Sequence, residues 1–353
     1  MMFRWRAVTC LSLLLLEVLG CQFGAKPRVR LGSYPSSIVG MKFLDPGELG
    51  PHGYRFNLSE KNGIVYTCKA GHIDIAHLRI AADWTAYLAA RTFECLMKND
   101  TGFSFKLNVE PCRYFVQITH PENWKDLPQT DKEQIAHDIS IKLGQYLAYT
   151  ATTWHEVLTW FGYKCIGFIP EFQSAFSWED SFSNVLGTRL AGQALREPWN
   201  EFDRAMTVAI DQELDKLGAQ SSGTARRATK NAHEAGFSGH RLFAIDVRKR
   251  NFDIGLHDGY VAPTIVPSVC ECEGAEAQAY PVPNLSFLSK HGFSVKVEIE
   301  PREWEKGKIL RIVYPDANNR RKRLEPVVHL AQIMDYIKED AAKRYGCDAP
   351  LGQ

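Results

Sequence analysis

Histidine and acidic residues recur in three segments that are otherwise largely apolar. The first segment, residues 71–79, contains His72, Asp74, His77 and Arg79. On a helix that begins near Asp74, the side chains of Asp74 and His77 are three residues apart and share a face. This spacing predicts either a metal site or a base with its orienting carboxylate. The alternative is a helix cap at Asp74 beside a hydrogen-bonded, partly buried histidine.

The second segment, residues 152–162, carries His155 and Glu156. A His-Glu pair on a helix begins the zincin pattern, in which a second histidine lies one turn further on. A threonine stands at that position here, so zinc would need other nitrogen ligands, for which His72 and His77 are candidates. Glu156 would then polarise a metal-bound water as a general base. The alternative is a pair of interior polar residues that neighbouring helices satisfy.

The third segment, residues 174–184, contains Glu179 and Asp180, and each lies four residues before a polar residue on the same helix face. One of these acids is a candidate metal ligand, while the other would orient a ligating histidine. The competing interpretation is a capping box, formed by Ser177 and Asp180 at the start of a helix.

These motifs are expected on core helices. Apolar periodicity and capping signals predict helices at residues 73–97, 130–161, 177–197, 201–217, 225–235 and 327–345. The second of these opens on a capping box, Thr-Asp-Lys-Glu at 130–133. Alternation predicts a hairpin at 103–109 and 114–119, and further strands at 242–247, 252–256, 261–266, 293–300 and 309–314. The predicted fold class is therefore α+β, with a mainly helical core and small antiparallel β elements.

The N-terminus predicts export. Arg4 and Arg6 precede an apolar run at residues 7–16, which is about half the length that a membrane span requires. Residues 18–21, Val-Leu-Gly-Cys, resemble the lipobox of bacterial lipoproteins, in which the cysteine is acylated and the chain is cut just before it. We therefore expect a lipid on Cys21 that anchors the body to a membrane. The resemblance implies the outer membrane, facing the periplasm; the alternative is an ordinary signal peptide or a buried apolar N-terminus.

The expected organisation has five parts. Residues 1–20 are a lipoprotein signal peptide, 21–50 a membrane tether, and 51–267 a helix-rich main domain that carries the motifs. Residues 268–283 form a spacer, and 284–353 a β-hairpin with a C-terminal helix packed on the main domain. Without residues 1–20 the chain has 40 basic and 40 acidic residues. This neutral balance argues against nucleic acid or polyanions as partners.

Seven cysteines follow Cys21, so an oxidising compartment would leave at least one thiol unpaired. Cys95 and Cys112 are expected to form a local disulfide between a helix end and the following hairpin. Cys270 and Cys272 are interpreted as disulfide-forming or free thiols rather than as a metal pair, because no matching second pair exists.

Four segments resemble one family. They read Gly-x-Ile-Asp-x-x-His-x-Arg at 71–79, Trp-His-Glu-x-x-x-Trp-Phe-Gly at 154–162, Ser-x-Glu-Asp-x-x-Ser-Asn at 177–184 and Arg-Asn-Phe-Asp-Ile-Gly at 250–255. With these motifs the chain resembles uncharacterised bacterial lipoproteins that share a domain of unknown function. The resemblance implies a cell-envelope location and no particular reaction, substrate or cofactor.

The leading functional hypothesis is a metal-dependent hydrolase, with zinc as its metal, acting on a peptide or cell-envelope substrate. Glu156 would be the base and Arg79 an oxyanion or substrate clamp. His77 and His155 are the first choice as ligands, and the full set of candidates is His72, Asp74, His77, His155, Glu179 and Asp180.

Two alternatives belong to other functional classes. One is a non-catalytic envelope lipoprotein for assembly or ligand binding, in which the polar cluster only fixes helix packing. The other is a metal-free cell-wall glycosidase that uses Glu156 and Glu179 as acid and base. Convergence of the His77 and His155 rings on one cleft-facing point would favour the metal site.

Overall fold

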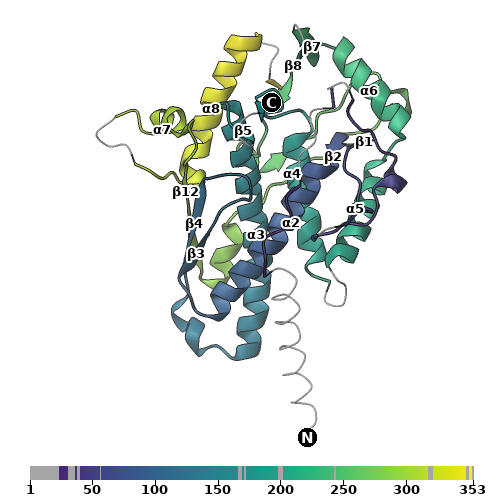
Figure 1. Cartoon of the computed structure of the whole chain (residues 1–353). Coiled ribbons are helices and arrows are strands. Elements are labelled where there is room, and N and C mark those ends of the chain that lie inside the picture. Colours follow the sequence, from purple (N-terminus) through teal and green to yellow (C-terminus); the bar gives the residue numbers. More distant parts are fainter. Residues whose placement is uncertain are drawn as a thin grey trace, which may run out of the picture.

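The computed structural model describes residues 24–30, 36–37, 40–55, 57–165, 169–170, 172–197, 202–241, 244–316, 321–346 and 350–351. The expected signal peptide and Cys21 lie outside these ranges. Within them the protein has the expected α+β fold, in which long helices form the centre and small, mostly antiparallel sheets lie around them (Figure 1). No helix of the described ranges combines the length and the apolar character that a bilayer crossing needs.

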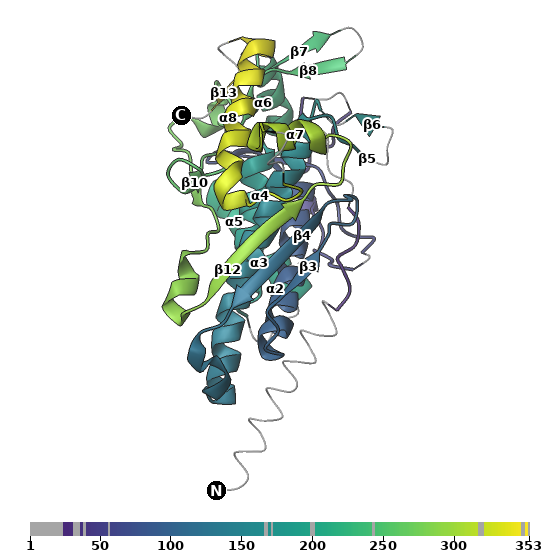
Figure 2. The same cartoon turned by 90° about the vertical axis from the view of Figure 1, so that its left-hand side faces the viewer.

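Three helices carry the sequence motifs. Helix α2 (Ile75–Met97) packs along α3 (Gln129–Trp160) and also against α4 (Asp180–Ala194). Asp74 caps α2, as in the alternative interpretation of this motif, because its Oδ1 accepts hydrogen bonds from the amides of Ala76 at 2.7 Å and His77 at 3.2 Å. The three helices lie at the centre of both views (Figures 1 and 2).

The crossing of α4 over α2 depends on a glycine. A Cβ atom on Gly187 would lie 2.1 Å from the carbonyl oxygen of Leu78, so any side chain there would push the two helices apart. Gly144 of α3 makes a similar approach to the backbone of α2, where its Cβ would lie 2.7 Å from the Ala89 nitrogen. These contacts set the distance between the helices that carry the motifs.

The two predicted capping boxes have different outcomes. The box at residues 130–133 is wrong, because α3 already begins at Gln129 behind Pro128 and has no side-chain cap. The box at Ser177 is half present: the Ser177 amide donates to Asp180 Oδ2 at 3.1 Å, while α4 begins only at Asp180.

The largest sheet has the strand order β12–β4–β3 and is antiparallel throughout. Strands β3 (Gly102–Phe105) and β4 (Arg113–Thr119) form the predicted hairpin. Strand β12 (Ser294–Glu300) pairs with β4 along its whole length, although the two are far apart in sequence. Alternate residues of β4 are buried, as expected for a sheet with one face on the helices.

The strand predicted at residues 309–314 is wrong, because this segment lies mostly in the helix α7 (Lys306–Val313). Ile309, Leu310 and Val313 are buried, and the first and last of these are four residues apart on one helix face. A short apolar run fits either periodicity, so the sequence pattern did not distinguish the two.

Further helices surround the core: α5 (Phe202–Leu217), α6 (Ser222–Glu234), α8 (Pro326–Tyr345) and the short 3-10 helices η1 (Pro46–Glu48), η2 (Glu122–Asp126), η3 (Cys270–Cys272) and η4 (Ser286–His291). The paired short strands are β1 (Ile64–Thr67) with β2 (Gly71–Asp74), β5 (Lys164–Cys165) with β6 (Ile169–Pro170), β7 (Ser238–Arg241) with β8 (Ala244–Val247), β9 (Arg250–Asn251) with β13 (Pro350–Leu351), and β10 (Tyr260–Val261) with β11 (Tyr280–Pro281). Residues 252–256, predicted as a strand, do not form one.

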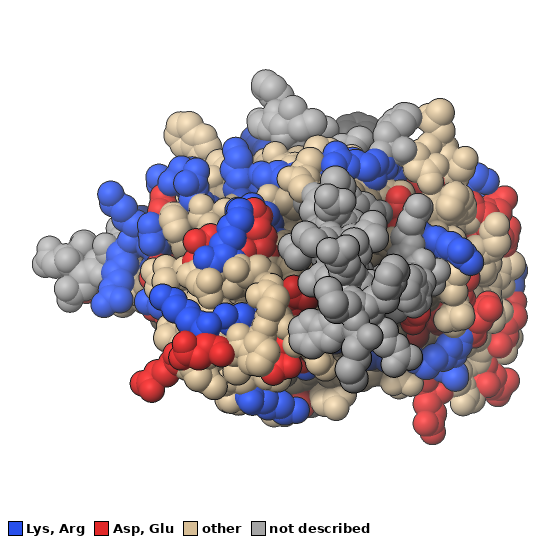
Figure 3. Space-filling model, turned by 90° about the horizontal axis from the view of Figure 1, so that it is seen from below, with Lys and Arg blue, Asp and Glu red and all other residues tan. Residues whose placement is uncertain are grey.

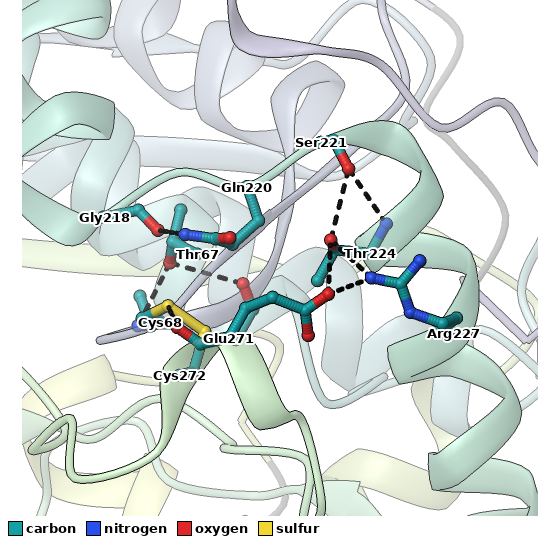
Figure 4. The surroundings of a disulfide bond; sticks show 11 residues. Thr67, Cys68, Gly218, Gln220, Ser221, Thr224, Arg227, Glu271 and Cys272 are labelled. Carbon is teal, nitrogen blue, oxygen red and sulfur yellow. Dashed lines mark hydrogen bonds and ion pairs between the residues drawn. A yellow bond between two sulfur atoms is a disulfide. The ribbon is translucent and has the colours of Figure 1, made fainter.

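A disulfide between Cys68 and Cys272 ties the β1–β2 turn to η3 (Figure 4). Segment 268–283, expected as a spacer, is therefore attached to the body. Cys95 and Cys112 are both buried and free, so the predicted bridge between them is wrong. The two thiols have different partners: Cys95 Sγ donates to the carbonyl of Asp100 at 3.4 Å, and Cys112 Sγ donates to a carboxylate.

The segment expected as a tether contacts the body in its described parts. Leu44 and Leu49 are buried, and Arg30 forms ion pairs with Glu60 and Asp83. Seen from below, the described surface carries acidic and basic side chains interspersed (Figure 3).

Candidate functional site

Three carboxyl groups surround the imidazole of His77 in the first turn of α2: Asp74 from the cap of α2, Glu156 from α3 and Asp180 from α4. His77 Nδ1 lies 2.8 Å from Asp74 Oδ2 and 3.7 Å from Asp180 Oδ1. His77 Nε2 lies 3.8 Å from Glu156 Oε1. We call Asp74, His77, Glu156 and Asp180 the His77 cluster.

Local structure ties Asp74 to α4. The Asp74 amide donates to Ser183 Oγ at 2.9 Å, and the Ser183 hydroxyl donates to the Glu179 carbonyl at 2.6 Å. The start of α2 and the start of α4 are therefore held together by one serine. This bond explains why Asp74 and Asp180 approach the same imidazole.

A strained turn holds the other two carboxylates. Phe176 has φ +52°, a left-handed conformation that costs free energy for a residue with a side chain. Its amide donates to Glu156 Oε2 at 2.7 Å, and the next amide, of Ser177, donates to Asp180. Asn251 donates its amide to the Phe176 carbonyl at 3.1 Å, which supports the turn from the other side. Two consecutive amides thus fix two carboxylates of the cluster.

The cluster is buried except at the imidazole. The side chain of His77 is 15% exposed, whereas those of Asp74, Glu156 and Asp180 are between 1% and 4% exposed. His77 is therefore the member of the cluster with the most contact with solvent.

The acids determine the charge of His77. Burial by itself lowers the pKa of His77, but the charges of Asp180 and Asp74, the Asp74 hydrogen bond and the charge of Glu156 together raise it well above its ordinary value. Burial raises the pKa of Asp180 well above its ordinary range, although the charge of His77 acts in the opposite direction. The charges of Glu156, Glu179 and Asp74 raise the pKa of Asp180 further, so the one imidazole does not compensate all the acids around it.

Glu179, expected as an alternative ligand, lies beside the cluster and outside its ligand group. Its Oε1 accepts a hydrogen bond from the Ser36 amide at 2.6 Å, and the side chain is buried. Burial raises the pKa of Glu179 to about 7, opposed by the Ser36 amide and helped by the charge of Asp74.

The geometry suits a metal ion. One oxygen each of Asp74 and Asp180 and one ring nitrogen of His77 all lie within 4.8 Å of one another. A metal with ligand bonds of about 2.0–2.2 Å has neighbouring ligand atoms about 3–3.5 Å apart, which is close to the distances observed. An imidazole with carboxylates suits zinc and other first-row divalent ions.

The family model described as "Protein of unknown function (DUF4056)" matches residues 19–241, more than half of the chain. The chain belongs to this family. Neither a curated protein nor a solved structure matches it. All four residues of the His77 cluster lie inside the DUF4056 domain, whereas β12, α7 and α8 lie beyond it.

Within the DUF4056 domain, His155 is directed to a different group from His77. Its Nδ1 lies 2.7 Å from Oε1 of the buried Glu110, while the neighbouring Glu156 joins the His77 cluster. Consecutive residues of a helix point about 100° apart, so His155 and Glu156 face different surroundings. The rings of His77 and His155 were expected to converge, but in the structure they contact different acids.

Arg79 lies two residues from His77, about 200° around α2, and therefore points to the opposite side. Its guanidinium donates to the carbonyls of Lys61 at 2.7 Å and Gly50 at 3.1 Å. These bonds hold the loop before β1. The expected role of Arg79 as a substrate clamp has no support in these contacts.

His72 packs against α6. Its Nε2 lies 3.0 Å from Thr229 Oγ1 and 3.3 Å from the Ala225 carbonyl, and its ring makes an edge contact with Tyr66. Burial lowers the pKa of His72 to about 4. This histidine is part of the core packing rather than of the metal-ligand group.

Two features of the site have no sequence motif. The left-handed turn at Phe176 follows from tertiary contacts, since Phe176 is neither glycine nor asparagine. Glu110 lies between the two strands predicted for the hairpin and is followed by proline, a pattern typical of a turn. Only its position opposite His155 identifies it as a buried acid.

Proposed function

We propose that this protein is an exported, lipid-anchored hydrolase that uses a divalent metal ion held by Asp74, His77 and Asp180, with Glu156 as the general base. The observation that carries the proposal is the convergence of these ligand atoms around His77, whose side chain is 15% exposed. Zinc is the metal we favour, as the donor set includes an imidazole.

The charge balance supports a bound cation. Three buried carboxylates surround one imidazole, and each buried charge costs several kcal/mol unless it is compensated. A divalent ion would compensate two of these charges at once. It would also supply a Lewis acid and lower the pKa of a water in the site.

Glu156 is placed to act as the base. Its Oε2 accepts the Phe176 amide, which fixes the carboxylate, while its Oε1 is directed at His77 Nε2. A carboxylate oriented in this way can accept a proton from a water bound beside His77. The Phe176 turn then has a functional role, because it positions the base.

The expected lipid on Cys21 supports a location at the outer membrane, facing the periplasm. A peptide or another cell-envelope component is the substrate class that this location favours. The glycosidase alternative has less support, because Glu179 is only 1% exposed and accepts the Ser36 amide.

One observation favours the non-catalytic alternative: each carboxylate of the His77 cluster already accepts a hydrogen bond within the protein.

Elemental analysis distinguishes the metal-dependent hydrolase from the non-catalytic protein. It is carried out on the purified full chain after zinc loading and removal of excess metal. We expect His77→Ala to lose one equivalent of zinc relative to the unmutated protein. The control is His137→Ala on α3, which should retain the unmutated zinc content. Equal zinc content in the unmutated protein and His77→Ala would contradict the metal site and favour a structural cluster.

A further inference from the structure

A second group of ligand-type side chains lies where β4, α3 and the loop after β12 meet. Glu110 and Cys112 precede β4, and Glu303 lies between β12 and α7. One ligand atom from each lies within 4.8 Å of the other two. We call Glu110, Cys112 and Glu303 the Cys112 cluster.

Hydrogen bonds hold the three residues in place. Cys112 Sγ lies 3.3 Å from Glu110 Oε2, and the Cys112 amide donates to Glu303 Oε1 at 3.0 Å. Glu110 Oε1 is bound by His155 at 2.7 Å, and the Arg302 amide donates to the second oxygen of Glu303 at 2.8 Å. Both carboxylates are therefore oriented before any ligand arrives.

The cluster is inside the protein. Glu110 is 2% exposed, Glu303 3% and Cys112 0%. Two buried carboxylates this close repel each other unless a proton or a cation lies between them. The imidazole of His155 carries at most one positive charge, so the group can accommodate a further cation.

A buried hydroxyl points to the same place. Tyr114 is fully buried, and its hydroxyl makes no hydrogen bond of regular geometry in the described part of the chain, although the Cys112 thiol lies within its reach. It lies within interaction range of the Cys112 thiol and of both carboxylates. A thiol is a weak partner for a buried hydroxyl, so the hydroxyl would gain from a ligand bound beside Cys112.

We infer that Glu110, Cys112 and Glu303 bind a second divalent metal ion, of the zinc type, at a site separate from the His77 cluster. A thiolate is a soft ligand that zinc prefers over magnesium or calcium. Bonds of about 2.3 Å to sulfur and about 2.1 Å to oxygen place the two atoms roughly 3.5 Å apart, close to the observed 3.3 Å.

On binding, the thiol of Cys112 transfers its proton to solvent and the sulfur donates an electron pair to the metal. His155 remains hydrogen-bonded to Glu110, as the partner that orients a ligating carboxylate. Because Glu303 lies outside the DUF4056 range, the metal would link that domain to β12 and α7. The site is buried and therefore structural.

Cobalt(II) tests this site specifically, because a thiolate bound to cobalt gives a charge-transfer absorption that oxygen and nitrogen ligands do not give. We expect this band when the purified full chain is titrated with cobalt(II), saturating at one equivalent. It should disappear in Cys112→Ser and weaken or shift in Glu303→Gln. The matched control is Cys95→Ser, a buried free cysteine outside the cluster, which should keep the band.

His77→Ala separates this inference from the proposed function, because it should keep the thiolate band while losing the other metal site. Absence of the band in the unmutated protein, with Cys112 shown by thiol titration to be reduced, would overturn the inference. Persistence of the band in Cys112→Ser would overturn it as well. If Cys112→Ser does not fold, cobalt titration of Glu303→Gln and of the unmutated protein still tests the inference.

Discussion

At the scale of single residues, the site consists of one imidazole and three carboxylates, and their hydrogen bonds give each a distinct position. Asp74 caps α2 and also contacts His77, so one side chain serves both the helix and the cluster. Glu156 and Asp180 are held by neighbouring amides of the Phe176 turn. These differences allow the residues to be tested separately.

Glu156→Gln should abolish hydrolysis while metal remains bound. The amide keeps the shape of the side chain and its contact with the Phe176 amide, but it cannot accept a proton in the same way. Loss of a general base lowers the rate by about 10²- to 10⁴-fold. Two quantities are measured: the turnover of a peptide or cell-wall substrate, and the zinc content of the variant. Unchanged turnover in this variant would exclude Glu156 as the base.

His72 should make the fold sensitive to acid. Its folded-state pKa is about 4, whereas the unfolded chain titrates near 6.5, so the folded state binds fewer protons. Its stabilising contribution is complete above pH 6.5 and is lost as the pH falls to about 4. The difference corresponds to about 3 kcal/mol.

Denaturant unfolding at pH 7 and at pH 4 measures this effect. The decrease in the free energy of unfolding between the two pH values should be smaller in His72→Asn, whose side chain does not titrate. Equal decreases in both proteins would show that another group governs the acid sensitivity.

At the scale of elements, the site depends on how closely α2 and α4 pack. Gly187 allows the carbonyl of Leu78 to approach α4, and that contact lies one residue beyond His77 in α2. A change in this spacing would move Asp180 relative to His77. The packing of helices and the geometry of the cluster are therefore coupled.

Gly187→Ala should destabilise the protein by about 1–3 kcal/mol, because the new Cβ would overlap the Leu78 carbonyl. It should also weaken metal binding at His77. Gly223→Ala is the matched control, since Gly223 lies in α6 with no atom closer than 3.6 Å to a new Cβ. The control should unfold at the same or a slightly higher denaturant concentration. An unchanged midpoint for Gly187→Ala would mean that the helices can separate at little cost.

At the scale of the whole molecule, distant segments are joined by one disulfide and by one sheet. Cys68 and Cys272 are 204 residues apart, and β4 pairs with β12 across a similar separation. Beside the disulfide, Glu271 forms an ion pair with Arg227 of α6 (Figure 4). The disulfide, the sheet and this ion pair are thus among the contacts that attach the segment after the DUF4056 range to the domain.

Cys272→Ser should lower stability by about 2–5 kcal/mol, because the unfolded chain gains conformational freedom when the long loop is opened. Cys270→Ser is the control, as Cys270 is an exposed free cysteine two residues away. Thermal unfolding of both variants measures the difference. The same midpoint for both would show that the disulfide does not restrict the unfolded state.

Features that depend on neighbours within one element could be predicted from the sequence. It predicted the α+β class, a long helix over most of α3 and the shared face of Asp74 and His77, and it offered the Asp74 cap as an alternative. These follow from local backbone geometry, since residues three or four apart on a helix share a face in any fold.

Which distant groups come into contact depends on tertiary packing. The rotation of α3 places Glu156, rather than His155, against His77, and packing rather than local sequence sets that rotation. The same holds for the Phe176 turn, for α7 in place of a strand, and for the pairing of Cys68 with Cys272. Each depends on contacts between segments far apart in the chain, whose free energies do not appear in the pattern of any one segment.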